Sequence, residues 1–172
     1  KNYPDPIEMF NKYGSDAMRW LLQSSPILRG LDLIVNEEAF ANATRSAILP
    51  LWNSYYFFTL YANSDGIQAN SVNDSENILD RYMLAKTRHY IEQTTKAMDA
   101  NDLFLASELY ESHLDVLTNW YIRGSRERFW RHEHDDDKTN AYNTLYTVLD
   151  LTSRAVAPLL PLMSESVWRG LH

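Results

Sequence analysis

Three long stretches of this sequence, residues 78–98, 103–132 and 139–157, carry apolar side chains every three or four residues. This spacing matches one face of an α-helix, which completes a turn in about 3.6 residues. Only short polar links separate the stretches, so neighbouring helices must pack antiparallel to bury their apolar faces. The pattern predicts a mainly α-helical fold, an antiparallel helix bundle closed by a last helix over 162–171. In the stretch 139–157 the predicted inner residues are Ala141, Leu145, Val148, Leu149, Thr152 and Val156.

Shorter elements are predicted at the start of the chain. Asp5 followed by Pro6 is typical of a helix start, because Asp accepts hydrogen bonds from the first turn and Pro fits the first helical position. This helix should end at Gly14, and a second should run from residue 15 to about residue 24. Residues 31–35 predict a short strand. The bundle is therefore expected to follow a small α+β segment.

A further helix is predicted from Asn36 to about residue 63, followed by a polar loop to residue 77. Pro50 lies inside this helix and removes one backbone hydrogen bond, so a kink or break is expected near residue 46. Its aromatic residues are interpreted as core, because large aromatic side chains dominate core burial. The predicted inner face consists of Ile48, Leu49, Trp52, Tyr55, Tyr56, Thr59 and Leu60.

The bulk composition limits the possible functions. With 172 residues, 45% hydrophobic and 23% charged, the chain can bury a core of its own. It has no cysteine, which excludes disulfides and thiolate chemistry. No apolar run is long enough to span a bilayer. The net charge of -7 opposes sequence-independent binding to nucleic acid, so any contact with RNA must use a local patch.

One such patch is predicted in residues 118–132, which hold four arginines, two tryptophans, a tyrosine and a phenylalanine, with Glu127 as the only acid. Arginine pairs with phosphates, and an exposed tryptophan can stack on an unpaired base. The simpler alternative is a solvated helix face with Trp130 packed on a neighbour. On a helical wheel Trp120 lies at the border, while Arg128 and Arg131 fall nearer the buried side. The outer side of the wheel holds Asn119, Arg123, Arg126, Glu127 and Trp130. The opposite side holds Leu114, Leu117, Tyr121 and Gly124.

Other groupings favour no chemistry. His132, His134 and the acids at 135–137 resemble metal ligands, but their close spacing in a link favours a solvated charged loop. His89 and His113 are isolated on helices. The sequence contains no Ser–His–Asp pattern, phosphate-binding loop or dinucleotide fingerprint. We therefore predict no catalytic residue and no metal site.

Several motifs occur in an order that resembles the isoleucyl-tRNA synthetase family, within the class I aminoacyl-tRNA synthetases. The likeness spans essentially the whole chain and begins with the segment that follows the family's KMSKS loop. Gly124 departs from it, because the family usually has arginine there. The matching motifs are Asn2–Pro6 (NYPDP), Tyr13–Arg19 (YGSDAMR), Ser24–Gly30 (SSPILRG), Pro50–Asn53 (PLWN), Asn119–Arg126 (NWYIRGSR) and Ala157–Pro161 (APLLP).

The resemblance implies a fragment that binds tRNA and performs no bond chemistry. Residues 1–45 would be a stem-contact segment and residues 46–172 a helical anticodon-binding domain. ATP and magnesium would bind in a catalytic domain outside the fragment, in a cytoplasmic, monomeric parent enzyme. The expected partners are isoleucine tRNA and the enzyme's other domains; a non-charging helical scaffold and a valyl-tRNA synthetase stay as alternatives. The expected tRNA-binding residues are Arg123, Arg126, Trp130, Arg128, Arg131 and Asn119.

Overall fold

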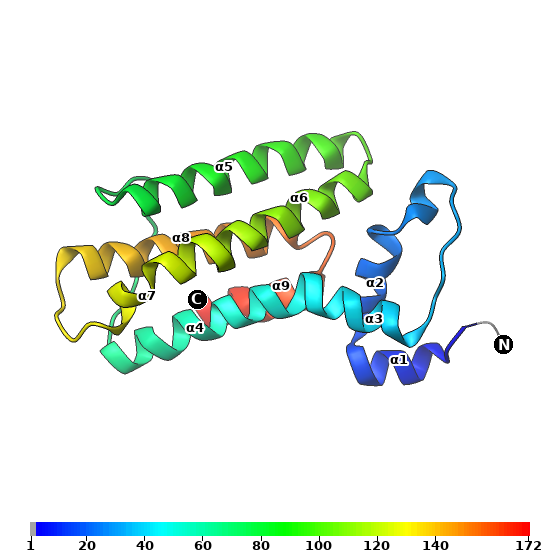
Figure 1. The fold of residues 1–172 in the computed structure, drawn as a ribbon, viewed down its shortest axis with the longest axis horizontal. Helices are drawn as coiled ribbons and strands as arrows, with labels where there is room; N and C mark the ends of the chain where they lie inside the picture. The colour runs from blue at the N-terminus through cyan, green and yellow to red at the C-terminus, as the bar shows by residue number, and fades with distance from the viewer. Residues whose placement is uncertain (1–2) are drawn as a thin grey trace.

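The computed structural model describes residues 3–172, and every regular secondary-structure element in that range is a helix (Figure 1). Asn2, the first residue of the NYPDP match, lies outside the described residues. The elements are α1 Pro6–Tyr13, α2 Ser15–Gln23, a 3₁₀ turn η1 Pro26–Arg29, α3 Glu37–Ala43, a π-helical segment η2 Thr44–Ile48, α4 Leu49–Asp65, α5 Ile78–Asp99, α6 Leu103–Asp115, a second π-helical segment η3 Val116–Ile122, α7 Arg123–Trp130, α8 Asp136–Val156 and α9 Pro161–Leu171.

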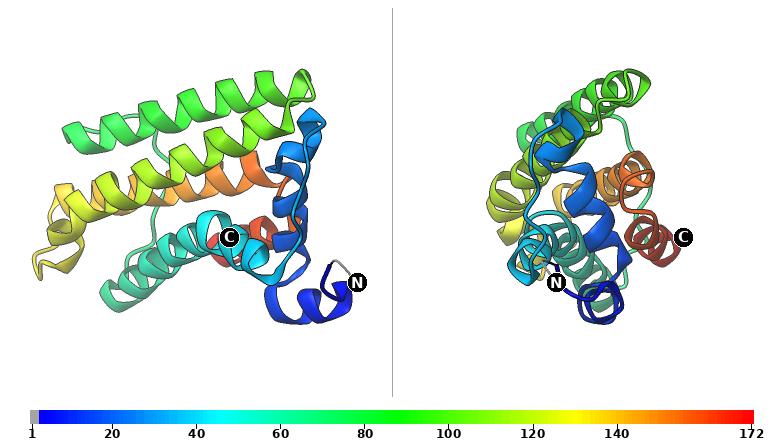
Figure 2. Two further views of the ribbon diagram at one scale, coloured as in Figure 1. Left: turned by 45° about the vertical axis from the view of Figure 1, so that its right-hand side comes forward. Right: turned by 90° about the vertical axis from the view of Figure 1, so that its right-hand side faces the viewer.

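The long helices α4, α5, α6 and α8 lie side by side as a bundle, and α1 to α3 gather at one end of it (Figures 1 and 2). A tight turn at residues 100–102 joins α5 to α6, and there Asn101 adopts a positive φ of 58°. The predicted inner residues of α8, from Ala141 to Val156, are all buried. The bundle prediction is therefore confirmed. No helix among residues 3–172 has the length and apolarity needed to cross a bilayer.

The predicted strand is wrong. Residues 31–36 are irregular, and the described part of the chain, 3–172, holds no strand. A strand needs a partner for its backbone N–H and C=O groups, and here only helices are near. Leu31 and Ile34, with 62% and 77% of their surface exposed, point to solvent instead of forming a sheet face. The N-terminal segment is therefore helical with an irregular loop.

At the place where a kink or break is expected, near residue 46, the structure has the π-helical segment η2, and the helical run continues through it. Pro50 has no N–H for the preceding turn, and the N–H of Leu49 donates to the carbonyl of Thr44, five residues back. The predicted inner face of α4 is wrong at most positions: the buried residues are Leu51, Ser54, Phe58 and Ala62, while Leu49, Trp52, Tyr56 and Leu60 are exposed. Of the predicted set, Ile48 and Tyr55 do pack against the core, and both are half-buried. No charged residue occurs between positions 49 and 64, so no polar side marks the outer face in the sequence.

The N-terminal helices pack on the end of the bundle through α2. Trp20 is buried in the main core, where its ring meets Tyr110 edge to face at 5.2 Å between centroids. Asp16 accepts a hydrogen bond of 2.8 Å from the backbone N–H of Met163 at the start of α9. Arg19 donates to the carbonyl of Pro158 at 2.9 Å. These contacts fix the segment against α6 and α9.

Candidate nucleic-acid interface

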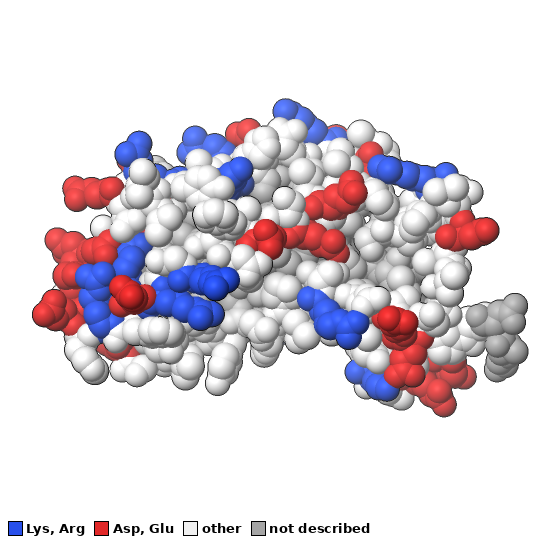
Figure 3. Space-filling model, viewed as in Figure 1, with Lys and Arg blue, Asp and Glu red and all other residues white. Residues whose placement is uncertain are grey.

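The arginine-rich segment lies on η3 and α7, which follow α6 without a loop. Leu114, Leu117 and Tyr121 are at most 2% exposed and anchor this helical run in the core. Asn119, Arg123, Arg126, Glu127 and Trp130 are all exposed, as the helical wheel predicts. In Figure 3 basic side chains gather over α7, with acidic ones beside them. The segment therefore displays a local basic patch on an acidic protein.

Arg126 and Trp130 form a pair on this outer face. The guanidinium carbon of Arg126 lies 6.0 Å from the centroid of the Trp130 ring, the range of a cation–π contact. Trp130 remains 51% exposed. Within residues 3–172, Arg123 and Arg126 have no carboxylate within ion-pair distance. The amide of Asn119 donates to Asp115 at 2.6 Å. Two guanidinium groups and one indole are thus available to a ligand.

Arg128 lies on the opposite side of α7 and is removed from the outer surface. Its guanidinium donates to both carboxylate oxygens of Asp80 on α5, at 2.7 and 2.8 Å. Tyr121 and Ser75 also donate to Asp80, each at 2.8 Å. The Nε of Arg128 donates to a carboxylate oxygen of Asp137 at 3.0 Å. Burial lowers the pKa of Arg128, but the hydrogen bonds and charge of Asp80 outweigh it and hold this pKa above its ordinary value.

Arg131 is half-buried and is held by the chain that follows it. Its guanidinium pairs with Asp135 at 2.7 Å and with Asp137 at 3.2 Å. Asp135 also caps α8 by accepting from the N–H of Lys138, and this hydrogen bond lowers the pKa of the Asp135 carboxyl. Hence α8 begins at Asp136, three residues before the predicted start at Thr139.

These contacts also account for the acidic link. Asp135 and Asp137 bind arginines and a helix start, while His132 and His134 are exposed. Within residues 3–172, no three His, Cys, Asp or Glu side chains converge as metal ligands would.

The buried side of α7 sets the direction of its outer face. The hydrogen bonds of Arg128 to Asp80 hold this side to α5. Phe129 meets Phe57 and Tyr142 edge to face, at 5.1 and 4.9 Å between ring centroids. The Tyr142 hydroxyl donates to Asp65 at 2.6 Å, and burial together with this carboxylate raises the pKa of Tyr142. Arg126 and Trp130 are therefore carried by a helix whose rotation is fixed from α4, α5 and α8.

Gly124 is exposed, but the side-chain direction at this position is towards α5, as the helical wheel predicts. A Cβ added there would meet Leu79 at 3.5 Å, an ordinary van der Waals contact. Replacing Gly124 by alanine should therefore raise the free energy of unfolding by about 0.5–1 kcal/mol, because glycine loses more backbone entropy in a helix. Chemical denaturation would measure it.

The matched control for that substitution is Gly66→Ala at the end of α4. Gly66 has a φ of 66°, which alanine adopts only with strain, so this variant should be less stable than the parent. A loss of stability in Gly124→Ala would show that α7 has no room for a side chain there.

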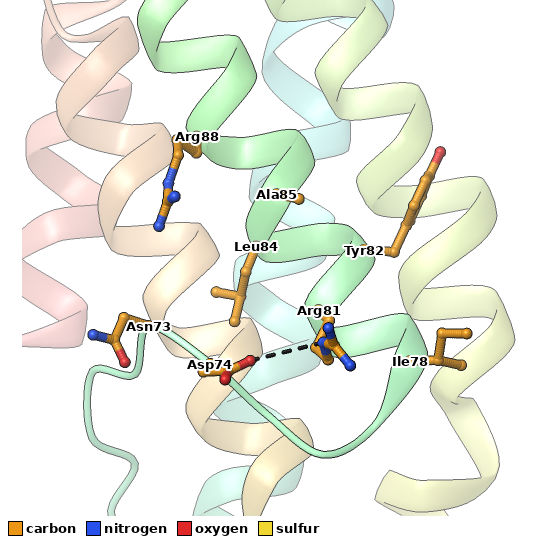
Figure 4. Close-up of a pocket in the computed structure, with 8 residues that line it drawn as sticks. All are labelled: Asn73, Asp74, Ile78, Arg81, Tyr82, Leu84, Ala85 and Arg88. Atoms are coloured by element: carbon orange, nitrogen blue, oxygen red, sulfur yellow. Dashed lines mark ion pairs between the residues drawn. The ribbon is translucent and has the colours of Figure 1, made fainter.

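A second basic groove lies between α5 and the loop before it (Figure 4). Arg81 and Arg88 line it together with Asn73 and Asp74. The Nε of Arg81 is 3.9 Å from Asp74, so a carboxylate already accompanies this guanidinium. The face of η3 and α7 is the better candidate, because in the described part of the chain no carboxylate lies within ion-pair distance of its outer arginines, and Trp130 lies beside them.

Residues 80–172 match the family described as the anticodon-binding domain of tRNA ligases. The chain belongs to this family. The match covers α5 from Asp80 onward and all of α6 to α9, and so includes the candidate interface. Both Asp80 and its partner Arg128 lie within the matched residues.

Relatives with a stated function specify the type of anticodon-binding domain. The chain is 49% identical to an isoleucine–tRNA ligase of Leifsonia xyli and 46% identical to one of Wolbachia pipientis, each over 99% of the chain. It spans only 15% and 16% of the length of these relatives. The predicted likeness to isoleucyl-tRNA synthetases is confirmed: the chain is the anticodon-binding region of an isoleucine–tRNA ligase.

Solved structures agree with this anticodon-binding domain in fold. A Mycobacterium tuberculosis methionyl-tRNA synthetase in complex with methionyl-adenylate matches with a TM-score of 0.72 over 95% of the chain and 33% of that protein, at 17% identity. The ternary complex of an Agrobacterium radiobacter LeuRS with tRNA and LeuAMS matches with a TM-score of 0.67 over 98% of the chain and 20% of that protein, at 19% identity. At such identities the likeness concerns the fold alone.

Proposed function

We propose that the outer face of η3 and α7 binds the anticodon stem-loop of isoleucine tRNA and holds the tRNA for aminoacylation elsewhere in the ligase. The observation that carries this proposal is the exposure of Arg123 and Arg126 beside Trp130, with no carboxylate paired to either arginine in the described chain. An exposed guanidinium that no carboxylate pairs stays available to an anionic partner, and two of them together make a local positive patch on an acidic protein. RNA phosphates supply that partner, and unpaired bases fit the indole.

The six residues expected from the sequence take different parts in this proposal. Arg123, Arg126, Trp130 and Asn119 would touch the tRNA. Arg131 borders the face and keeps part of its guanidinium exposed, so it would add charge at the edge. Arg128 would act through Asp80 by holding α7, since its donors are used inside the protein.

The reaction itself would take place outside this region. The chain spans only 15% and 16% of the length of two isoleucine–tRNA ligases that it matches. We infer that ATP and magnesium bind in a catalytic domain of the longer ligase. That ligase would act on tRNA in the cytoplasm as a monomer, with its remaining domains as the other partners of this region.

We also propose that residues 1–45 contact the tRNA stem and residues 46–172 the anticodon arm. The contacts of Trp20 and Arg19 with α6 and the α8–α9 link support a fixed spacing between the two parts. The helical run from Glu37 to Asp65 crosses position 45, so any division there lies within α3, η2 and α4 rather than in a loop.

The pair Arg126→Ala and Trp130→Ala in a full-length isoleucine–tRNA ligase with this region should raise the Kd for isoleucine tRNA about 10- to 100-fold, because it removes one phosphate contact and one stacked base. Isoleucine-dependent ATP–pyrophosphate exchange should stay unchanged, since that step needs no tRNA. Filter binding over a salt series measures the first effect, and the salt slope should fall by about one.

Arg88→Ala is the matched control, since Arg88 is an exposed arginine on the outer side of α5. It should leave both measurements unchanged. An unchanged Kd in the Arg126 and Trp130 variant, or a loss of exchange activity with it, would refute the proposed interface.

A further inference from the structure

Trp120 is the most exposed of the five tryptophans. It is 67% exposed, against 51% for Trp130, 42% for Trp52 and Trp168, and 1% for Trp20. It stands on η3, between Leu117 and Tyr121, which are both buried in the core. A large apolar ring is thus displayed to water from a rigid helix, where burial would ordinarily be favoured. Such a display is typical of a contact surface.

The π-helical turn accounts for the difference between the exposure of Trp120 and the border position that the wheel of a regular α-helix gives it. The N–H of Arg123 donates to the carbonyl of Thr118, five residues back, so the turn is wider than an α-helical one. Two consecutive residues, Asn119 and Trp120, then share the solvent side. Wide turns of this kind are frequent at functional sites.

The residue one turn further on leaves the indole uncovered. Side chains of a helix lean towards its N-terminus, so the side chains about one turn after Trp120, at positions 123 to 125 across this wider turn, are the ones that could cover the indole. Four residues after Trp120 stands Gly124, which is exposed and has no side chain. Arg123, three residues after Trp120, is exposed and has no ion pair among residues 3–172. A planar group could therefore lie on the indole beside a free guanidinium.

We propose that Trp120 is a stacking platform for an unpaired base of the tRNA, with Arg123 contacting the adjacent phosphate. This inference rests on the proposed function and adds a residue to that face. Two acids lie on the same side: Asp115, which accepts from the amide of Asn119 at 2.6 Å, and Glu127, which forms no ion pair with Arg123 within residues 3–172. A protein surface could also cover an indole, but it would have to present a carboxylate to Arg123 beside the apolar contact, whereas single-stranded RNA carries a phosphate next to every base. The combination of ring and cation favours RNA.

Trp120→Ala in the full-length ligase should raise the Kd for an isoleucine tRNA transcript roughly 5- to 100-fold, the effect of losing one stacked base. Trp120→Phe should keep most of the affinity, because any aromatic ring can stack. Trp168→Ala, which removes an exposed tryptophan on α9, is the control and should leave the Kd unchanged. Thermal unfolding of each variant would be recorded alongside.

Each result separates this inference from the proposed function. A Kd within twofold of the parent in Trp120→Ala, with weakened binding in the Arg126 and Trp130 variant, overturns the stacking role alone. Unchanged binding in both variants overturns the proposed function as well. Equal loss in Trp120→Ala and Trp120→Phe, together with a lower melting temperature, shows that the indole packs on another domain and also overturns the inference.

Discussion

Replacing Asp80 by alanine is expected to lower the free energy of unfolding of this chain by about 3–5 kcal/mol, the cost of leaving a buried charge without its partner. Asp80 is fully buried and accepts both branches of the Arg128 guanidinium, as well as the hydroxyls of Tyr121 and Ser75. Without the carboxylate, Arg128 stays charged inside the protein, with Asp137 as its remaining acid. Urea denaturation followed by circular dichroism would measure the loss.

Asp74→Ala provides the control for this prediction. Asp74 faces Arg81 across 3.9 Å at the surface, and such exposed pairs contribute at most about 1 kcal/mol. A second variant, Asp80→Leu with Arg128→Met, should recover much of the stability, because apolar side chains of similar size leave no charge unpaired. A loss below about 1 kcal/mol in Asp80→Ala would contradict the role assigned to this pair.

Acid should destabilise the protein through His113 as the pH falls from 6.5 to about 4. His113 is 4% exposed, its Nε2 lies 2.8 Å from the Thr152 hydroxyl, and its ring stacks on Tyr90 at 4.5 Å between centroids. Burial lowers its pKa to about 4 from an ordinary value of 6.5. Between these values the unfolded chain takes up a proton that the folded chain does not, so stability falls with pH.

The full loss through His113 is about 3 kcal/mol, because each pKa unit corresponds to about 1.4 kcal/mol. The free energy of unfolding should be measured from pH 7 to pH 4 for the parent chain and for His113→Gln. The variant starts less stable but should lack this part of the pH slope. His89→Gln, which changes an exposed histidine of α5, should keep the slope of the parent. Parallel slopes for the parent and His113→Gln would contradict the prediction.

The position of the exposed basic face could be predicted from the sequence because its signals are local. Leu117 and Tyr121 alternate with Asn119, Arg123 and Arg126 at helical spacing, so the inner and outer sides follow from one wheel. The exposure of Trp120 did not follow, because the wheel assumes a regular α-helix and η3 is π-helical. Positive charges at the outer positions and the motif order then indicated tRNA.

The role of Arg128 needed the tertiary structure. In the sequence Arg128 is one of four arginines within residues 118–132, and only its position nearer the buried side of the helical wheel distinguishes it. Its partner Asp80 lies 48 residues earlier, on another helix. A buried ion pair between distant segments leaves no periodic trace in either of them. Local reasoning therefore grouped Arg128 with the arginines that are expected to bind tRNA.

By itself the sequence determined the helical class, the inner face of α8 and the outward direction of Arg126 and Trp130. Each depends on contrast between apolar and polar residues within a few turns. Only the tertiary structure decided the buried side of α4, the irregular path of residues 31–36 and the enclosure of Arg128. A helix without charged residues has no intrinsic outer side, a short apolar run becomes a strand only beside another strand, and a guanidinium is buried only where a distant carboxylate meets it.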